Sequence, residues 1–350
     1  MFTYILLDSI CKLRGERTVS NIYHLLTAKK STQTIQDSYI YQLTNYFGIY
    51  KRLERKTFQK ELRHLYDQGW IEVYQDKQVV LTTEGRSVLN GFDHSQIYLN
   101  GMKYDNHALF TMQVIQLLVQ TCTHIQQHHD TFIPVVDDES VQQKVKEIFY
   151  YYQKDTNTIL YHLYQELTRL FEQAPEPLGH LFTDQLTTPR HIGSSKIQLA
   201  REYGQTVHDM HCQLMNLSHF LCFAIEKDSS VSFLKEIVPH ERNMNLPLTG
   251  SAQKTYKLWQ KGHGLEMIAS QRNLKISTIQ DHMVEIAYVV KNFDYSPFLS
   301  DHQLQWIANQ IDRLQTNKLK EIKESLDDHI SYFQIKLVLA MSHQQKEGVF

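Results

Sequence analysis

Leu265-Glu-Met-Ile-Ala-Ser-Gln-Arg-Asn-Leu-Lys-Ile-Ser-Thr-Ile-Gln-Asp-His-Met-Val284 is the stretch that decides the fold class of this sequence. It predicts two short helices joined by a tight turn. Asn273 can adopt the left-handed conformation that ends a helix, as glycine often does. Ser277 can then cap the second helix through its hydroxyl group. Two short helices joined in this way are typical of a helix-turn-helix.

The apolar residues of this stretch support the same interpretation. A small residue at Ala269 lets the second helix approach the first closely. The side chains that we expect to face inward are Ile268, Ala269, Leu274, Ile276, Ile279 and Met283. Those that remain more outward on the second helix are Thr278, Gln280, Asp281 and His282.

A helix-turn-helix lays its second helix in the major groove of DNA, although many such units are only structural or protein-binding helix pairs. Here the second helix carries Asp281 and neither arginine nor lysine. Recognition of the DNA backbone or of a DNA structure is therefore favoured over base reading. Further phosphate contacts can come from Lys254, Lys257 and Lys261 upstream. The candidate DNA-binding residues of this unit are Arg272, Lys275, Ser277, Thr278, Gln280 and His282.

Near its start the sequence predicts a winged helix, in which helices precede a β-hairpin. Apolar residues between positions 47 and 65 recur at the spacing of a small helical core. Residues 69–73 and 79–82 predict two short strands across a polar turn that places Lys77 at the tip of the wing. Residues 83–89 predict a further helix.

The helix before this hairpin has a basic face. Lys56, Lys60 and Arg63 fall on one side of it by three- and four-residue spacing. An ordinary solvated surface explains many such charge runs, but a winged helix presents its recognition helix at this place. The candidate DNA-binding residues of this module are Arg55, Lys56, Gln59, Lys60, Arg63 and Lys77.

Between the two modules the sequence predicts a helical middle segment. For Tyr150–Tyr152 we expect core and rim packing rather than stacking on bases. Residues 194–204 are a second, weaker helix-turn-helix candidate, but one long helix is predicted to follow, which favours a structural pair. The acidic residues 137–139 are expected to cap a helix that begins near Val141 rather than to bind a metal.

Composition and charge describe a globular protein of two or three domains. The 350 residues are 21% charged and 42% hydrophobic. We predict a mostly α protein with a winged-helix-like domain at 1–92, a helical middle domain at 93–250 and a helix-turn-helix domain at 251–345. The formal net charge is +4 over 1–92, −7 over 93–250 and +1 over 251–350. The acidic middle is therefore expected to meet a basic protein partner rather than nucleic acid.

Several function classes are disfavoured. The phosphate-binding motif GxxxxGK[ST] of P-loop ATPases is missing, and no nucleophile elbow appears. His124, His128 and His129 lack a neighbouring carboxylate or cysteine ligand, which argues against a metal site. No apolar run approaches the length of a membrane span, and four scattered cysteines indicate a reducing cytosol. We expect no enzymatic activity, cofactor, metal, membrane partner or small-molecule substrate.

Both ends of the sequence resemble known protein families. The opening stretch, Phe2-Thr-Tyr-Ile-Leu-Leu-Asp-Ser-Ile-Cys-Lys-Leu-Arg-Gly-Glu-Arg-Thr-Val-Ser-Asn-Ile-Tyr-His-Leu-Leu26, resembles the YpbB family of Bacillus-like bacteria. The part from Thr255-Tyr-Lys-Leu-Trp259 through Ile330-Ser-Tyr-Phe-Gln-Ile-Lys-Leu-Val-Leu-Ala340 resembles the helix-turn-helix domain associated with RecQ-type helicases. The resemblance implies an accessory role in DNA unwinding, repair or recombination, with a RecQ-type helicase as partner. It implies no catalytic residues.

Three interpretations stay open. The first is a non-enzymatic accessory factor of a RecQ-type helicase, located in the cytoplasm with the nucleoid. The second is a transcription regulator that reads an operator through the second helix of the C-terminal unit. The third is a protein–protein adaptor that never meets DNA. Salt dependence and sequence preference of DNA binding separate the first two.

Overall fold

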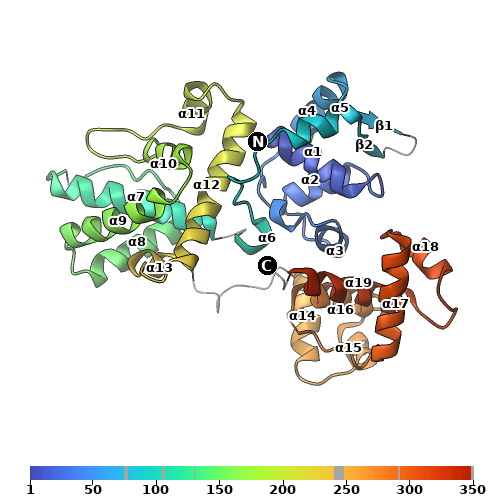
Figure 1. Ribbon diagram of the computed structural model, residues 1–350. Coiled ribbons are helices and arrows are strands. Elements are labelled where there is room, and N and C mark those ends of the chain that lie inside the picture. The colour runs from blue at the N-terminus through green and yellow to red at the C-terminus, as the bar shows by residue number, and fades with distance from the viewer. Residues whose placement is uncertain (75–77, 105–106, 130, 240–247, 291, 348–350) are drawn as a thin grey trace. The chain divides into compact units, whose positions relative to one another are not determined.

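The computed structural model describes residues 1–74, 78–104, 107–129, 131–239, 248–290 and 292–347, with side chains up to Ser342 (Figure 1). These residues form helices α1–α19, the 3-10 helix η1 and one two-stranded sheet, so the predicted mostly α class is confirmed. The chain divides into two compact units. The first unit comprises Met1–Leu6 and Val88–Met244, and the second comprises Leu7–Ser87 and Asn245–Phe350. The predicted domain boundaries at 92, 250 and 345 stay a prediction. Most residues of the two candidate DNA-binding modules belong to the second unit.

The N-terminal elements include the predicted hairpin. They are α1 (Phe2–Leu13), α2 (Ser20–Leu26), α3 (Thr32–Ile40), η1 (Thr44–Tyr46), α4 (Arg55–Asp67), β1 (Ile71–Val73), β2 (Val79–Leu81) and α5 (Thr83–Asn90). β1 and β2 pair antiparallel with Ile71 opposite Leu81, and an isolated bridge joins Thr18 to Gln78. This arrangement is that of a winged helix, in which α3 and η1 lie in the chain between α2 and the helix before the wing.

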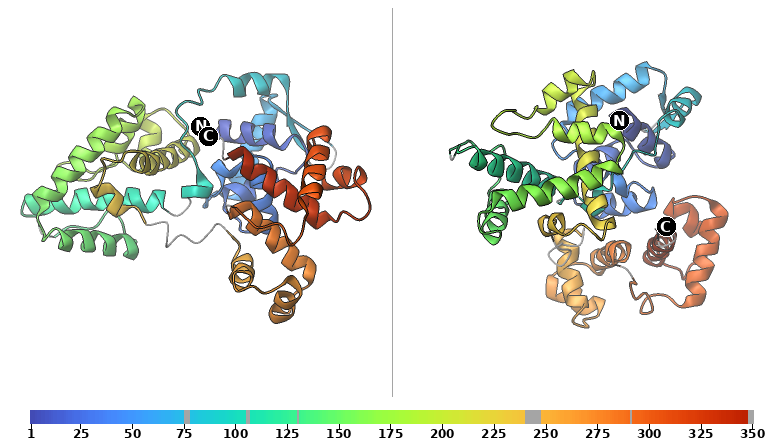
Figure 2. Two further views of the ribbon diagram at one scale, coloured as in Figure 1. Left: turned by 60° about the horizontal axis from the view of Figure 1, so that its bottom comes forward. Right: turned by 60° about the vertical axis from the view of Figure 1, so that its left-hand side comes forward.

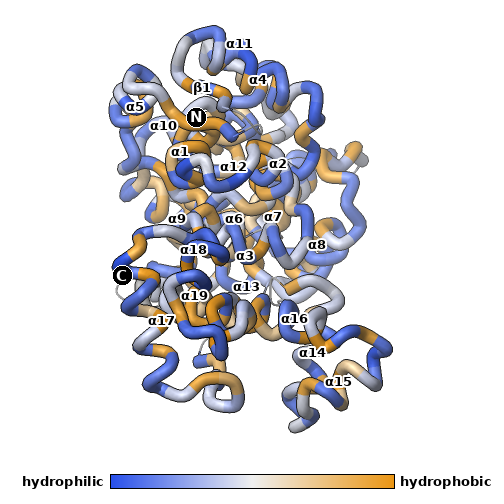
Figure 3. The backbone as a smooth tube through the Cα atoms, turned by 90° about the vertical axis from the view of Figure 1, so that its right-hand side faces the viewer, coloured by the Kyte–Doolittle hydropathy of each residue, from blue (hydrophilic) through white to orange (hydrophobic). Residues whose placement is uncertain are grey.

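The C-terminal elements form an all-helical domain. They are α14 (Gly250–Trp259), α15 (Leu265–Arg272), α16 (Ile276–Val289), α17 (Asp301–Leu314), α18 (Leu319–Glu324) and α19 (Tyr332–Glu347). α16 and α19 pack together, α14 and α15 pack on α16, and α17 and α18 pack on α19, as can be followed in Figure 2. Hydrophobic and hydrophilic residues are interspersed along these helices (Figure 3). Most of the buried ones form one core, and Ile268, Ala269 and Ile279 form a separate small cluster. α3 packs against both α16 and α19 and so joins this domain to the winged helix.

The first unit is a helical domain, as predicted for the middle of the chain. Its helices are α6 (Gly101–Tyr104), α7 (Ala108–Gln126), α8 (Glu139–Tyr151), α9 (Thr156–Glu172), α10 (Glu176–Thr183), α11 (Lys196–Glu202), α12 (Val207–Lys227) and α13 (Phe233–Ile237). The predicted acidic cap of α8 is confirmed, because the Asp138 carboxylate accepts from the backbone N–H groups of Ser140 and Val141. The long helix predicted after the weaker helix-turn-helix candidate is α12.

Two expectations for this unit are wrong. α7 is long and apolar enough, by length and composition alone, to cross a membrane. Half of it is buried among the other helices of the unit, as is usual for the core helix of a folded domain. In the tyrosine run, Tyr152 packs on inner rings, but Tyr150 and Tyr151 are exposed. Core packing at the end of α8 is thus confirmed for Tyr152 and wrong for Tyr150 and Tyr151.

Candidate nucleic-acid interface

Helix α4 has one buried side and one basic side. Phe58 and Leu65, two turns apart, are buried, and the ring of Phe58 lies 5.5 Å from that of Tyr23 on α2. Because these residues hold the apolar side inward, the opposite side faces solvent. The predicted contact residues on α4 are all exposed: Arg55, Lys56, Gln59, Lys60 and Arg63.

Lys56, Lys60 and Arg63 are exposed cations on the solvent side of α4. Among the residues that the structure describes, no carboxylate lies within ion-pair distance of any of them. Their charge is therefore available to an external anion. Phosphate oxygens are such anions, and they need no particular base sequence.

Arg55 has a different position from its neighbours. Its guanidinium donates a hydrogen bond to the Ser20 hydroxyl at 3.0 Å and lies 5.3 Å from the ring centroid of Tyr23. It therefore holds the start of α4 against α2, and its charge is partly engaged. Sequence reasoning missed Arg52, an exposed cation just before α4. The adjacent basic pair Lys51-Arg52 was the signal that could have found it. Lys77, the predicted tip of the wing, lies outside the described residues.

The turn of the C-terminal helix-turn-helix has the predicted geometry. Asn273 ends α15 in the left-handed conformation, with φ of 50° and ψ of 49°. Ile268, Ala269 and Ile279 form a small buried cluster against which Leu274 packs. Met283 is also buried, in the main core of the domain. Five of the six predicted inward residues are therefore confirmed.

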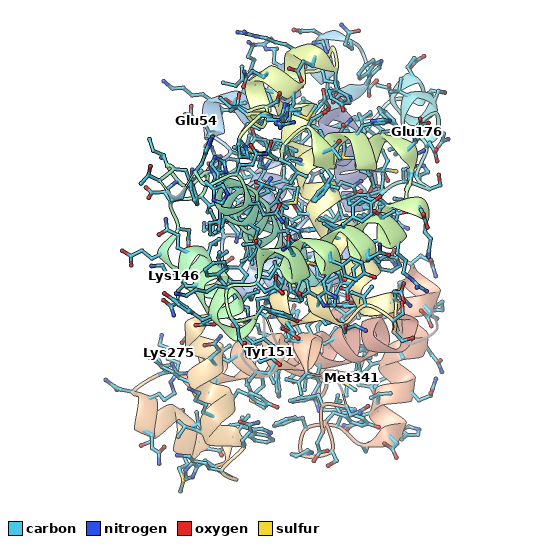
Figure 4. All side chains as sticks on the ribbon, turned by 90° about the vertical axis from the view of Figure 1, so that its left-hand side faces the viewer. Glu54, Lys146, Tyr151, Glu176, Lys275 and Met341 are labelled. Carbon is cyan, nitrogen blue, oxygen red and sulfur yellow. The ribbon has the colours of Figure 1, made fainter. Side chains whose placement is uncertain are left out.

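The start of the second helix differs from the prediction. α16 begins at Ile276 with Lys275 at its N-cap position, so Ser277 lies inside the first turn and is not the cap. Ile276 is 42% exposed and does not fill the turn. Lys275, labelled in Figure 4, and Ser277 are both exposed. These two residues remain accessible to DNA at the beginning of the helix.

His282 faces the protein interior, contrary to the prediction. It is only 5% exposed, and its Nδ1 lies 2.9 Å from Thr255 Oγ1 on α14. Burial, and then the charge of Arg272, lower its pKa below the ordinary value. The reason for the error is helical spacing: position 282 follows the inward residue Ile279 by three residues. His282 therefore cannot contact DNA in this structure.

Arg272 is also engaged inside the domain. Its guanidinium donates to the Ser251 backbone carbonyl at 2.8 Å and to the Ser251 hydroxyl at 2.9 Å, and it bonds the Thr255 hydroxyl. These bonds connect α15 to α14. Arg272 is therefore a positioning residue rather than a free phosphate ligand. Upstream, Lys254, Lys257 and Lys261 are exposed, and their contact with phosphate stays a prediction.

Beyond its first turns α16 is a core helix. Thr278 and Gln280 are half-buried, and Asp281 accepts from Lys336 Nζ of α19 at 2.7 Å. Residues 282–288 are all buried, and the ring of Tyr288 stacks on Tyr39 of α3 with centroids 5.2 Å apart. From position 282 onward this helix is thus covered by its neighbours, which include α3 and α19. Within the helix-turn-helix, only α15, the turn and the first turns of α16 can therefore approach DNA.

The described residues contain no group of three or more histidine, cysteine, aspartate or glutamate side chains that could hold a metal ion. His124, from the histidine group noted in the sequence, has its Nδ1 2.8 Å from the backbone oxygen of Gln120.

Comparisons with known proteins give the chain its relatives. Residues 251–339 match the protein family described as a helix-turn-helix domain. Protein YpbB of Bacillus subtilis (strain 168) is 28% identical over 350 residues, and the match covers 98% of this chain and 98% of that protein. No solved structure matches the chain. Residues 251–339 are thus a helix-turn-helix domain, which indicates DNA binding, and the chain as a whole is similar to YpbB, as the resemblance in its sequence implied.

Proposed function

We propose that this protein is a non-enzymatic DNA-binding accessory factor of a RecQ-type helicase that acts in DNA repair or recombination. The observation that carries the DNA part is the exposed, unpaired row Lys56, Lys60 and Arg63 on the solvent side of α4. In a winged helix the helix before the wing is the one that meets the groove.

The binding is expected to depend on the DNA backbone more than on base sequence. Lysine is a point charge that suits phosphate, and α16 is buried from position 282 onward, so only its first turns can approach DNA. Lys275 and the lysines around α14 add charge at the accessible start of the helix-turn-helix. The expected ligand is therefore a duplex or a branched DNA structure, bound with little sequence preference.

The helicase part of the proposal rests on the resemblance to the YpbB family and on charge. The middle segment 93–250 carries −7 and is unsuited to phosphate. It is the part that we assign to the protein partner. We place the protein in the cytoplasm, associated with the nucleoid.

A double substitution with a matched control tests the DNA surface. Lys56→Gln with Lys60→Gln removes two unpaired charges from α4. Lys318→Gln with Lys320→Gln removes two exposed lysines that pair with Glu321 at 3.1 Å and Glu324 at 3.9 Å. Binding to a labelled duplex and to a forked duplex is measured by fluorescence anisotropy across a salt series.

We expect the α4 variant to bind more weakly to every sequence, with a slope of log affinity against log salt shallower by about 1.8, since each phosphate contact contributes about 0.9. The control should match the natural protein. Unchanged binding by the α4 variant refutes this DNA surface, and strong preference for one duplex sequence favours the operator-reading regulator.

A pull-down tests the partner. The immobilised protein should retain a RecQ-type helicase from nuclease-treated extract. If the helicase is not retained while DNA binding is intact, the accessory role is refuted.

A further inference from the structure

We propose that exposed tyrosines on α8 and α9 form a docking surface for a basic protein segment that presents arginine side chains. We name this surface the tyrosine face, and it consists of Tyr151, Tyr161 and Tyr164. Their exposed fractions are 73%, 62% and 67%. Figure 4 labels Tyr151 at the end of α8. The inference rests on the proposed role of the middle segment as the protein-binding part of the chain.

Exposed tyrosines at this density indicate recognition. Tyrosine offers a large contact area with few rotatable bonds, so it is enriched in protein interfaces and their hot spots. Tyr161 and Tyr164 are three residues apart on α9 and therefore lie on the same side of the helix. Among the described residues these rings belong to no hydrophobic core.

The tyrosine face has a rigid backing of inner rings. Tyr151 lies 5.1 Å from Tyr152, and Tyr161 lies 5.8 Å from His162, measured between ring centroids. Tyr152 and His162 in turn both pack on the buried Phe233, at 5.3 Å and 5.7 Å. The two exposed rings are thus linked through three inner ones.

Hydrogen bonds between α9 and the start of α13 fix the backbone that carries Phe233. The Glu166 carboxylate accepts from the backbone N–H groups of Ser232 and Phe233 at 2.9 Å each, and from that of Leu234 at 2.8 Å. These bonds satisfy the start of α13 and fix Phe233 behind the rings. A surface that is already ordered loses little entropy when a partner binds.

Charge selects the kind of partner. The segment 93–250 carries −7, exposed Glu147 lies one helical turn before Tyr151, and exposed Glu236 lies close enough to Tyr152 to act on its hydroxyl. The net charge of the segment favours a cationic partner over the phosphates of nucleic acid, although exposed Lys146 and Lys154 lie near the end of α8. A guanidinium group stacks on tyrosine faces and carries the matching charge. At the edge of the surface a lysine already makes a cation–π contact, since Lys154 Nζ lies 5.3 Å from the ring centroid of Tyr150.

A peptide titration on the full chain tests the proposal. The probes are a labelled peptide of alternating arginine and glycine and the matched lysine–glycine peptide. The proteins are the natural chain, Tyr151→Ala with Tyr161→Ala, and the ring-preserving Tyr151→Phe with Tyr161→Phe. The control is Tyr74→Ala with Tyr332→Ala, which removes two exposed tyrosines from the second unit. Circular dichroism verifies that each variant is folded.

We expect the arginine peptide to bind more tightly than the lysine peptide. The alanine pair should weaken it about tenfold, as expected for two lost cation–π contacts. The phenylalanine pair and the control should retain the affinity. Binding that is unchanged in the alanine pair, or equal for both peptides, overturns the proposal.

If the proposal fails, two further measurements show whether another kind of molecule occupies this surface. The first is binding of single-stranded oligothymidylate. If the alanine pair weakens this binding but not that of the peptide, the surface belongs to nucleic acid. A self-association seen by sedimentation equilibrium and abolished by the alanine pair assigns it to a second copy of this chain. Duplex binding through α4 is measured on the same variants and should not change, so failure of the tyrosine face and failure of the α4 surface are distinguishable.

Discussion

Replacing Glu285 tests how α3 and the helix-turn-helix domain are joined within the second unit. Glu285 is fully buried on α16. Its carboxylate accepts from the Thr32 hydroxyl at 2.9 Å, from the Thr249 hydroxyl at 3.2 Å and from the Thr249 backbone N–H. Thr32 begins α3 and Thr249 is the N-cap of α14, so one side chain connects three helices.

Two substitutions at this position should have opposite effects. Glu285→Ala leaves the N–H of the half-buried Thr249 without its partner, which costs about 1–3 kcal/mol, and loses a buried methylene worth about 0.8 kcal/mol. We therefore expect the free energy of unfolding to fall by about 2–4 kcal/mol. Glu285→Gln keeps the shape, its amide oxygen can accept from Thr249, and its amide N–H can donate to the hydroxyls. Because Gln carries no charge to bury, this variant should be at least as stable at neutral pH.

The effect of pH has a defined sign. Burial raises the pKa of Glu285 above the ordinary value of 4.5, so the folded protein binds this proton more tightly than the unfolded chain. The natural protein therefore gains stability as the pH falls from the raised pKa towards 4.5, and loses it again as the pH rises. The Gln variant lacks this dependence. Its advantage over the natural protein should shrink on acidification.

Tryptophan fluorescence is the assay of choice, because all three tryptophans, Trp70, Trp259 and Trp306, lie in the second unit. In urea, the midpoint of Glu285→Ala should fall by about 1 M or more. The exposed Glu324→Ala is the control and should not move it. The reasoning is refuted if Glu285→Ala unfolds at the same urea concentration as the natural protein. It is also refuted if Glu285→Gln loses as much stability as Glu285→Ala at neutral pH.

Three further substitutions test single contacts. Arg272→Ala removes the bonds to Ser251 and should destabilise the second unit by about 1–3 kcal/mol in the same fluorescence assay; no change would mean that these bonds are dispensable. Asn273→Val places a β-branched residue at a φ of 50° and should cost about 1–3 kcal/mol, whereas Asn273→Gly should be tolerated, as read from the melting temperature. In the first unit, Asp138→Ala removes the cap of α8 and should cost about 1 kcal/mol by circular dichroism.

Local features of this protein could be predicted from its sequence, because they depend on neighbouring residues. The left-handed turn at Asn273 follows from side-chain chemistry at one position. The exposed basic side of α4 follows from the spacing of Phe58 and Leu65, which decides what must face solvent. The acidic cap of α8 is equally local. In each case the interacting groups lie within a few residues, so periodicity and capping rules suffice.

Only the tertiary structure decided which surfaces are covered. The bond between Thr32 and Glu285 spans 253 positions in the chain, and no local pattern could pair them. This pairing places α3 on α16 and removes most of the second helix from any DNA surface. The three-residue spacing from Ile279 places His282 towards the inner side of α16, but only the packing of α14 shows that this position is buried. Conversely, Tyr150 and Tyr151 are exposed because no other element of the described chain packs over them. Burial of a helix side depends on what packs against it, and that is a property of the whole fold.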